Sequence, residues 1–274
     1  MKEEAQIFPP SSSTPASEKN KGVGLASGLK AVNNNTFLEK SIMLAEKVPT
    51  RNSILFVWLN NYAGILLKTP TKTLLIDPTD VKQKSLPKID AILVTHEHYD
   101  HLDQHLLADI QKTNNCAVIA DQTSADKLKL LIPTAKLTPV TAGDKTKIGD
   151  VTIKAEKCRH PAASPVTYII TSEDGVKVWH TADTLPYPEM AQIGKTEQLD
   201  VVFCTVGIAP GTSPETGSEI AWLTKPKIAV PYHTNTAENQ KKFQQILKKE
   251  QPKTTCVIPQ INKPYVVTKG EKQT

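Results

Sequence analysis

The 274-residue sequence has few cysteines, no long apolar run and no dense block of one charge. Its four cysteines are far apart and form no Cys-x-x-Cys pair, so we interpret them as reduced residues and expect no disulfide framework. No segment approaches the roughly 20 apolar residues that a membrane-spanning helix requires. The net charge of +5 is mild and no lysine- and arginine-rich block occurs, so the sequence gives no clear indication of nucleic-acid binding.

The N-terminal part lacks both a secretory signal and a globular pattern. Its first five residues are acidic where a signal peptide is basic, and no apolar segment follows, so we expect a cytoplasmic protein. Residues 1–35 are polar and rich in proline, serine and asparagine, which predicts a disordered or loosely attached tail. Residues 36–52 predict a short helix and a linker, and residues 53–274 the globular domain.

The globular part begins with strands and then alternates strands with helices. Turn residues between its first apolar runs predict antiparallel hairpins, and the later alternation predicts helices packed on sheets. Predicted strands cover residues 54–59, 63–67, 73–77, 90–95, 117–120, 151–155, 166–171, 176–179, 201–204 and 227–230, with a final strand pair at 256–258 and 265–267. Predicted helices cover residues 102–113, 123–131, 213–223 and 238–249. Together these elements predict two facing sheets with helices outside.

A dense group of polar side chains follows the predicted strand at residues 90–95. His96, Glu97, His98, Asp100 and His101 stand in one short run, although the whole chain has only seven histidines. Because alternate side chains of an extended segment point the same way, His96 and His98 can face one ion, and Asp100 and His101 a second one. Imidazole and carboxylate ligands suit zinc, manganese or iron. The alternative is a solvated turn that is merely rich in histidine.

Further histidines and one aspartate follow apolar strands elsewhere in the chain. His160 comes after the strand at 151–155, with Cys158 beside it as a further candidate ligand, and Asp183 follows His180 after the strand at 176–179. His233 follows the strand at 227–230. A lone histidine at a strand end is more often a surface or hydrogen-bonded residue. Together with residues 96–101, however, these positions supply the ligands that two ions still need.

The combined spacing resembles the metallo-β-lactamase superfamily over about residues 53–268. The motif that carries this resemblance is His96-x-His98-x-Asp100-His101, followed by His160, Asp183 and His233. Four further stretches resemble the branch of L-ascorbate-6-phosphate lactonase and its uncharacterised metal-dependent hydrolase relatives, with N-acyl-phosphatidylethanolamine phospholipase D more distant: Trp58-Leu59, Leu75 to Pro78, Trp179 to Thr184 and Val230 to Thr236. The resemblance implies an α/β fold, a four-layer αββα sandwich with a dinuclear metal site at the sheet edge.

The resemblance also assigns the ligands of two divalent ions, for which we expect zinc, with manganese as the alternative. It implies that His96, His98 and His160 hold one ion, that Asp100, His101 and His233 hold the other, and that Asp183 bridges them. Three positions depart from the branch. Asn60-Asn61 replace the usual Gly-His, Ala182 replaces a glycine before Asp183, and Tyr99 replaces a small residue. These departures leave the metal ligands intact and leave the substrate open.

The function implied by the resemblance is hydrolysis of a small ester, lactone or phosphoester by a hydroxide held between the two ions. Asp100, Asp183 and His180 are the candidate catalytic residues, and Tyr99, Arg159, His180 and Asn235 are the candidate substrate-binding residues. His180 is alternatively a packing histidine, and Arg159 alternatively forms a surface salt bridge. Asp77 is expected either to hydrogen-bond a metal-binding histidine or simply to form the turn before Pro78.

Other functions are compatible with the same pattern. A nuclease or phosphodiesterase acting on nucleic acid or phospholipid is the main alternative to a hydrolase of small molecules. A redox protein of this fold tends to have a carboxylate at the position of His98, and a non-catalytic descendant tends to lose ligands, so both are disfavoured. We expect a small-molecule substrate and no membrane span, and a homo-oligomer is compatible with the sequence.

Overall fold

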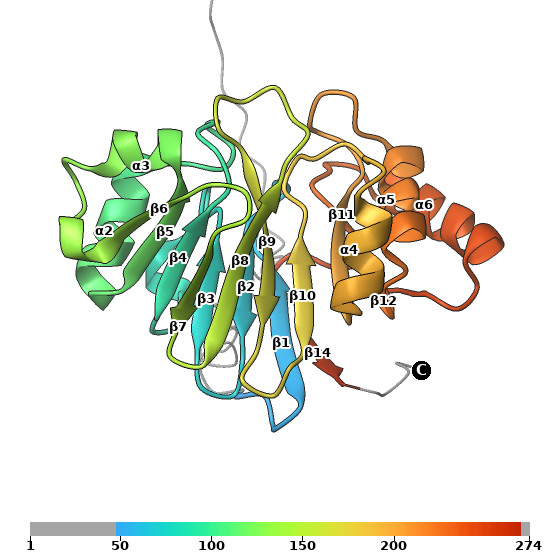
Figure 1. Ribbon diagram of the computed structural model, residues 1–274, viewed down its shortest axis with the longest axis horizontal. Coiled ribbons are helices and arrows are strands. Elements are labelled where there is room, and N and C mark those ends of the chain that lie inside the picture. The colour runs from blue at the N-terminus through green and yellow to red at the C-terminus, as the bar shows by residue number, and fades with distance from the viewer. Residues whose placement is uncertain (1–47, 270–274) are drawn as a thin grey trace, which may run out of the picture. The chain divides into compact units, whose positions relative to one another are not determined.

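The computed structural model describes residues 48–269, which form two seven-stranded sheets (Figure 1). The first sheet has the spatial order β14 (Pro264–Thr268), β1 (Ser53–Trp58), β2 (Ile65–Lys68), β3 (Thr73–Ile76), β4 (Ala91–Val94), β5 (Ala117–Asp121) and β6 (Leu137–Val140). The second has the order β13 (Thr255–Cys256), β12 (Ile228–Tyr232), β11 (Val201–Thr205), β10 (Lys177–His180), β9 (Val166–Thr171), β8 (Val151–Lys157) and β7 (Lys145–Ile148). The predicted tail at residues 1–35 and residues 36–47 of the predicted helix and linker at 36–52 lie outside the described residues.

Both sheets combine an antiparallel half with a parallel half. In the first, the pairs from β14 to β3 are antiparallel and those from β3 to β6 are parallel. In the second, the pairs from β7 to β10 are antiparallel and those from β10 to β13 are parallel. The predicted hairpins at the start of the domain are therefore confirmed, and parallel strands of both sheets are available to present residues at their carboxyl ends.

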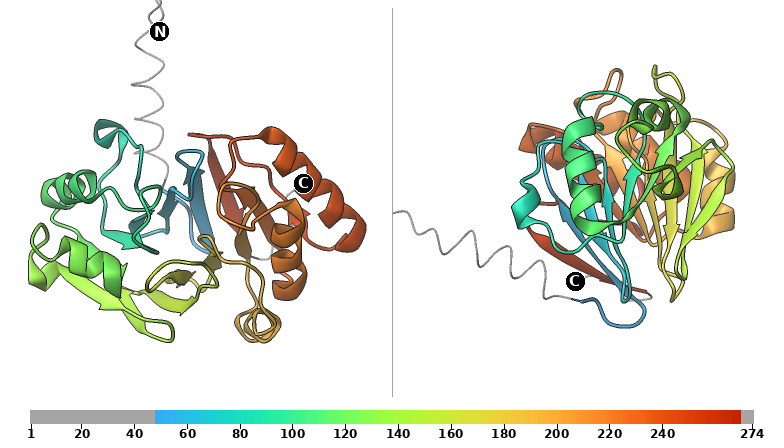
Figure 2. Two further views of the ribbon diagram at one scale, coloured as in Figure 1. Left: turned by 90° about the horizontal axis from the view of Figure 1, so that it is seen from above. Right: turned by 90° about the vertical axis from the view of Figure 1, so that its left-hand side faces the viewer.

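The helices cover the outer faces of the two sheets. Helices α2 (Gln104–Asn114) and α3 (Gln122–Leu128) pack on the first sheet. Helices α4 (Met190–Glu197), α5 (Pro214–Thr224) and α6 (Ala237–Glu250) pack on the second, and Figure 2 shows the green and the orange-red helices on opposite sides of the strands. Two 3-10 helices, η1 (Gln83–Ser85) and η2 (Thr134–Lys136), lie in connections.

The main hydrophobic core lies between the two sheets. Apolar side chains from both inner faces form one buried cluster. The rings of Phe56 from β1 and Phe203 from β11 meet edge to face with their centroids 5.1 Å apart. With the helices outside, these layers confirm the predicted αββα sandwich. Within residues 48–269, no helix combines the length and apolar character that a bilayer-spanning segment needs.

Several elements differ from their prediction. Strands β6 and β7 were not predicted because Pro139 interrupts the first and lysines occupy half of the second. Helix α4 was not predicted because Gly194 lowers its helix propensity, although a side chain at this position would clash with the backbone of Thr224 in α5. The close packing of α4 against α5 therefore requires glycine at position 194, and this is a tertiary contact that helix propensity does not predict.

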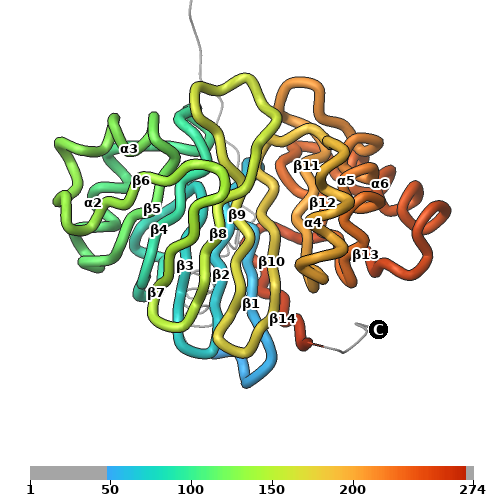
Figure 3. Tube along the Cα trace, viewed as in Figure 1, coloured from blue at the N-terminus to red at the C-terminus, as the bar shows by residue number. Residues whose placement is uncertain are grey.

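One predicted helix boundary and one predicted strand pairing are wrong. The predicted helix 123–131 ends at Leu128. The backbone N–H groups of Leu131 and Ile132 both donate hydrogen bonds to the Leu128 carbonyl there. The predicted final strand pair does not exist, because β13 joins β12 in the second sheet and β14 joins β1 in the first (Figure 3). The C-terminal residues therefore contribute one edge strand to each sheet.

Candidate metal centre

The candidate ligands come from both sheets and lie at their carboxyl ends. Strand β4 of the first sheet runs directly into the segment 96–101. In the second sheet, His160 lies in the connection that follows β8, Asp183 follows β10, and His233 follows β12. Both sheets must therefore stay at a fixed separation if these side chains are to serve one site.

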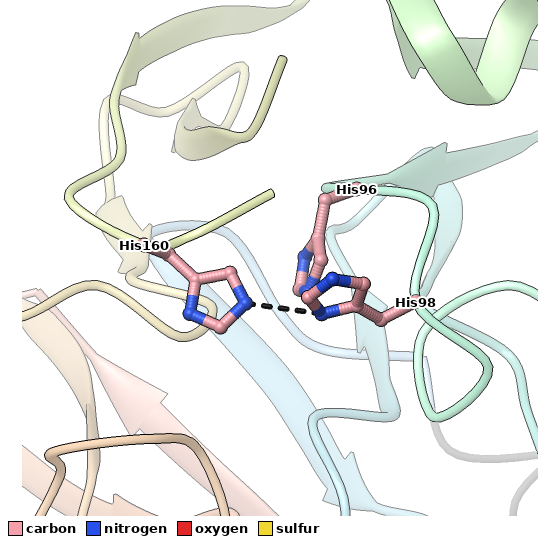
Figure 4. A group of neighbouring side chains, drawn as sticks. All are labelled: His96, His98 and His160. Carbon is pink, nitrogen blue, oxygen red and sulfur yellow. Dashed lines mark hydrogen bonds between the residues drawn. The ribbon is translucent and has the colours of Figure 1, made fainter. Parts of the chain in front are cut away.

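The first group of candidate ligands consists of three histidines. Ligand atoms of His96, His98 and His160 all lie within 4.8 Å of one another, and Figure 4 shows the three rings converging from two segments of the chain. His160 Nε2 is 3.1 Å from His98 Nδ1. Burial is the main cause that lowers the pKa of both His96 and His160, which favours the neutral imidazole that a metal ion binds.

The second group consists of Asp100, His101, Asp183 and His233, which are all buried and offer ligand atoms within 4.8 Å of one another. Asp183 Oδ1 lies 3.1 Å from His101 Nε2 and 3.0 Å from His233 Nδ1. Its other oxygen, Oδ2, lies 3.7 Å from the Nε2 atoms of both His96 and His160. Asp183 therefore faces both groups, and the structure brings all seven predicted ligands together.

Unpartnered polar atoms show that this centre fits metal ions. The buried atoms without a hydrogen-bond partner include His96 Nε2, His101 Nε2, Asp183 Oδ1 and both ring nitrogens of His233. Buried polar atoms are nearly always paired, so an orphaned set of imidazole and carboxylate atoms points to cations as the missing partners. Nitrogen and oxygen donors in this combination suit zinc.

Asp183 and the two histidines beside it shift one another's pKa in opposite directions. Burial alone would raise the pKa of Asp183, but the charges of His101 and His233 hold it well below its usual range. Burial likewise opposes the charged form of His101, yet Asp183 and Asp77 raise its pKa well above the ordinary value. The centre therefore demands positive charge beside Asp183, which divalent ions would supply in place of protons.

Asp77 lies behind the second group and orients one of its ligands. Its Oδ2 is 2.8 Å from His101 Nδ1 and accepts the Thr95 hydroxyl at 2.7 Å, while its Oδ1 accepts the Thr95 backbone N–H at 2.8 Å. A carboxylate in this position fixes the ring so that Nε2 faces the site. Of the two roles predicted for Asp77, these contacts support the one that orients a histidine.

We expect Asp77→Asn to lower the affinity for metal ions by about 10–100-fold, because it removes the charge that orients His101. The backbone of Asp77 has a φ of 46°, which asparagine tolerates, so the substitution isolates the loss of the carboxylate. Competition with a chromogenic chelator measures the affinity. Asp80→Asn is the matched control, because Asp80 has a φ of 48° but is exposed. Equal affinities of the two variants would rule out this role.

Two residues of the centre have a left-handed backbone. His233 has a φ of 54°, and Ala182, which precedes Asp183, has a φ of 47°. Glycine adopts this region with the least strain, so the glycine that the family resemblance implies at the position of Ala182 would suit this backbone. The Ala182 carbonyl accepts hydrogen bonds from Thr205 and from the Tyr232 hydroxyl, and these contacts hold the turn that presents Asp183.

The structure places His180 in the core, which favours its packing role over the predicted contact with substrate. Its ring is fully buried, with Nε2 2.8 Å from the Ala63 carbonyl and 3.4 Å from the Tyr232 hydroxyl. Strand geometry explains the placement, because Val178, two residues earlier, also belongs to the core between the sheets. These contacts favour a packing histidine, the alternative interpretation of the sequence.

The other predicted substrate residues lie on the surface. Tyr99 is 80% exposed, and Arg159 and Asn235 are exposed as well. The Arg159 guanidinium donates to the Pro186 carbonyl at 3.2 Å, which differs from the salt bridge considered as its alternative role. Cys158 belongs to neither group of ligands, and burial raises the pKa of its thiol.

Tyr62 is a neighbour of the centre that sequence reasoning missed, and its ring centroid lies 6.2 Å from that of His233. Tyr62 follows the departure at Asn60-Asn61, and Asn60 builds this turn. The Asn60 Oδ1 accepts the backbone N–H groups of Tyr62 and Gly64, and its Nδ2 donates to the Thr79 carbonyl. The turn that replaces Gly-His therefore places an aromatic ring beside a candidate metal ligand.

Comparison with known proteins identifies the class. Residues 61–245 match the family model described as a beta-lactamase superfamily domain, so the chain belongs to the metallo-β-lactamase superfamily and the expected family is confirmed. A UPF0173 protein of Pyrococcus abyssi is 33% identical over 182 residues, covering 66% of this chain and 83% of that protein. A UPF0173 metal-dependent hydrolase of Pyrobaculum arsenaticum is 28% identical over 187 residues, covering 64% of this chain and 82% of the relative.

Solved structures support the same fold. Igni18, a metallo hydrolase from Ignicoccus hospitalis, aligns with a TM-score of 0.68 at 18% identity, covering 78% of this chain and 98% of that one. The metallo-beta-lactamase fold protein YhfI from Bacillus subtilis aligns with a TM-score of 0.65 at 14% identity, covering 79% of this chain and 100% of that one. At these sequence identities the likeness establishes the αββα fold, and the chemistry has to be argued from the residues of the site.

Proposed function

We propose that this chain is a metal-dependent hydrolase of small esters, lactones or phosphoesters that works with two divalent ions. The observation that carries the proposal is the position of Asp183. One of its oxygens lies against His101 and His233, and the other faces His96 and His160. A single carboxylate shared in this way fits a pair of ions better than one ion.

The two groups of side chains would each hold one ion. His96, His98 and His160 would hold the first, and Asp100, His101 and His233 the second, with Asp183 common to both. Divalent ions at such a site lower the pKa of water to near neutrality and polarise a carbonyl or phosphoryl oxygen. Zinc suits the donor set best, and manganese is the alternative.

Asp100 is the residue best placed to move a proton. Its Oδ2 is 3.4 Å from His233 Nε2, and its side chain is 10% exposed, whereas Asp183 is 2% exposed. Burial alone would raise the pKa of Asp100, but the adjoining His233 ring and the charge of His101 lower it. An ionised carboxylate at the edge of the site can orient an attacking water and accept its proton.

The substrate is proposed to be bound by exposed side chains beside the metal centre. Tyr99 follows the ligand His98 directly, Arg159 precedes His160, and Asn235 comes two residues after His233. The Arg159 guanidinium suits an anionic group such as a phosphate or carboxylate. Tyr99, with its large exposed ring, would pack against an apolar part of the substrate.

A substrate panel tests the proposal. It contains lactones, carboxylic esters, phosphorylated sugars, phosphodiesters and RNA, each assayed with zinc and with manganese. We expect turnover of at least one small ester, lactone or phosphoester, and loss of that turnover on removal of the metal. Turnover restricted to RNA would assign the site to a nuclease, and turnover that survives complete metal removal would refute the proposed chemistry.

A further inference from the structure

Glu97 lies between two candidate ligands but belongs to neither group of ligands. Its side chain is half-buried and turns toward the second sheet, where Oε1 accepts the backbone N–H of Ala163 at 2.9 Å. Ala163 is part of the connection between β8 and β9 at residues 158–165, which we call the His160 loop because it carries that ligand. This hydrogen bond therefore links the segment of His96 and His98 to the loop that supplies the third histidine.

A second carboxylate of the first sheet holds the next residue of the same loop. Asp121, at the end of β5, is fully buried, and its Oδ2 accepts the Ser164 hydroxyl at 2.6 Å. The backbone N–H of Thr123 donates to Ser164 Oγ at 2.9 Å. Ala163 and Ser164 are thus both fixed to the first sheet, although the loop belongs to the second.

The other end of the loop is tied within the second sheet. The Arg159 carbonyl accepts the Leu185 backbone N–H at 3.0 Å, and the Arg159 backbone N–H donates to the Thr184 hydroxyl at 2.7 Å. These contacts place the loop relative to Asp183 but not relative to His96 and His98. The far end of the loop is held to the first sheet by the Val166 backbone N–H, which donates to the Thr95 carbonyl at 2.9 Å. The links through Glu97 and Asp121 add to this tie within the loop itself, closer in sequence to His160.

We infer that Glu97 is a positioning residue that holds the His160 loop against the first sheet and thereby completes the three-histidine group. The inference deepens the proposed function and rests on it for its consequence in metal binding. The link is a hydrogen bond from a backbone N–H to a carboxylate oxygen, a charge-assisted type that is stronger than a neutral one.

The three-histidine group depends on this link more than the second group does. His160 is its only histidine from the second sheet, and its partners His96 and His98 both come from the first. A contact that orients a ligand typically changes metal affinity by about 10–100-fold. Loss of the Glu97 side chain is therefore expected to lower the affinity for one of the two ions by that factor and to leave the affinity for the other nearly unchanged.

Glu97→Ala and Glu97→Gln separate positioning from direct participation. Glutamine keeps an oxygen that accepts the Ala163 N–H, whereas alanine does not. Zinc titration of the full-length variants against a chromogenic chelator should show one ion bound 10–100-fold more weakly in Glu97→Ala and within a few-fold of wild type in Glu97→Gln. Glu219→Ala, at an exposed glutamate of α5, is the matched control and should bind both ions normally.

Amide hydrogen exchange tests the link independently of metal. In chelator-treated protein, Glu97→Ala should accelerate exchange in the segment containing Ala163 and Ser164 at least several-fold, while Glu97→Gln and Glu219→Ala should not. Unchanged exchange in Glu97→Ala would overturn the inference and leave the proposed function intact. Equal loss of metal in Glu97→Gln and Glu97→Ala would instead make Glu97 a ligand or a proton carrier. Wild-type protein that binds no metal would refute the proposed function, and the exchange result would still decide the role of Glu97.

Discussion

Replacing Asp183 with alanine is expected to lower the rate of hydrolysis by on the order of 10³-fold, measured on the best substrate of the panel. Asp183 has one oxygen against each group of candidate ligands, so its loss should weaken the hold on both ions. Metal ions contribute several kcal/mol of transition-state stabilisation, and each tenfold in rate corresponds to about 1.4 kcal/mol. The expected loss of rate, expressed as a free energy, is thus similar to the transition-state stabilisation that the metal ions provide.

Two further variants show whether this loss comes from the carboxylate. Asp183→Asn keeps the shape of the side chain and removes its charge, so it should lose nearly as much activity as Asp183→Ala. Asp109→Ala, at an exposed position on α2, should keep wild-type activity. Because the fold is held by the core between the sheets, circular dichroism of all three variants should match wild type. A folded Asp183→Ala protein with full activity would mean that Asp183 has no part in the reaction.

The second large effect is expected for His98→Ala. It removes one of three ligands from the first group and leaves the four ligands of the second group in place. We expect the bound metal to fall from two ions to one per chain and activity to fall by at least about 100-fold, since removing a residue that merely orients a ligand already costs about 10–100-fold. Elemental analysis after dialysis against metal-free buffer measures the number of ions.

His105→Ala is the matched control for this substitution. His105 lies on α2, is exposed, and belongs to neither group of ligands. It should therefore retain two ions and full activity. Two ions retained in His98→Ala would contradict the assignment of His98, and an equal loss in both variants would show that histidine removal acts through the stability of the fold.

The candidate metal centre could be predicted from sequence because its residues follow local rules. Each ligand comes shortly after an apolar strand, and parallel strands of a sheet end at the same edge. The spacing of His96, His98, Asp100 and His101 restricts them to one short turn, so few alternative arrangements exist. The structure brings these residues together with His160, Asp183 and His233 for that reason.

His180 shows where the same reasoning is least specific. Its position after an apolar strand resembles that of the candidate ligands, but a strand-end residue can face inward or outward. Trp179 packs in the cluster under the helices, whereas Val178 packs between the sheets, so alternation points His180 into the core. The alternation of side chains along the strand therefore predicts the direction of the His180 side chain better than its place at the strand end does.

The contacts that support the centre could not be predicted at all. Glu97 meets Ala163 across 66 positions of sequence, and Asp121 meets Ser164 across 43. Such pairs depend on how two sheets are placed against each other, which local patterns do not specify. Asp77 was an intermediate case, because its position at a strand end suggested a link to a histidine without identifying His101.

The most direct test of the account is the number of metal ions that the centre holds. Protein purified without chelator, and protein stripped and then reconstituted with zinc or manganese, are analysed for metal per chain alongside their rate of hydrolysis. The shared position of Asp183 predicts two ions per chain, with activity rising as the second ion binds. Full activity with a single ion, or no bound ion after reconstitution, would contradict a centre built around two ions.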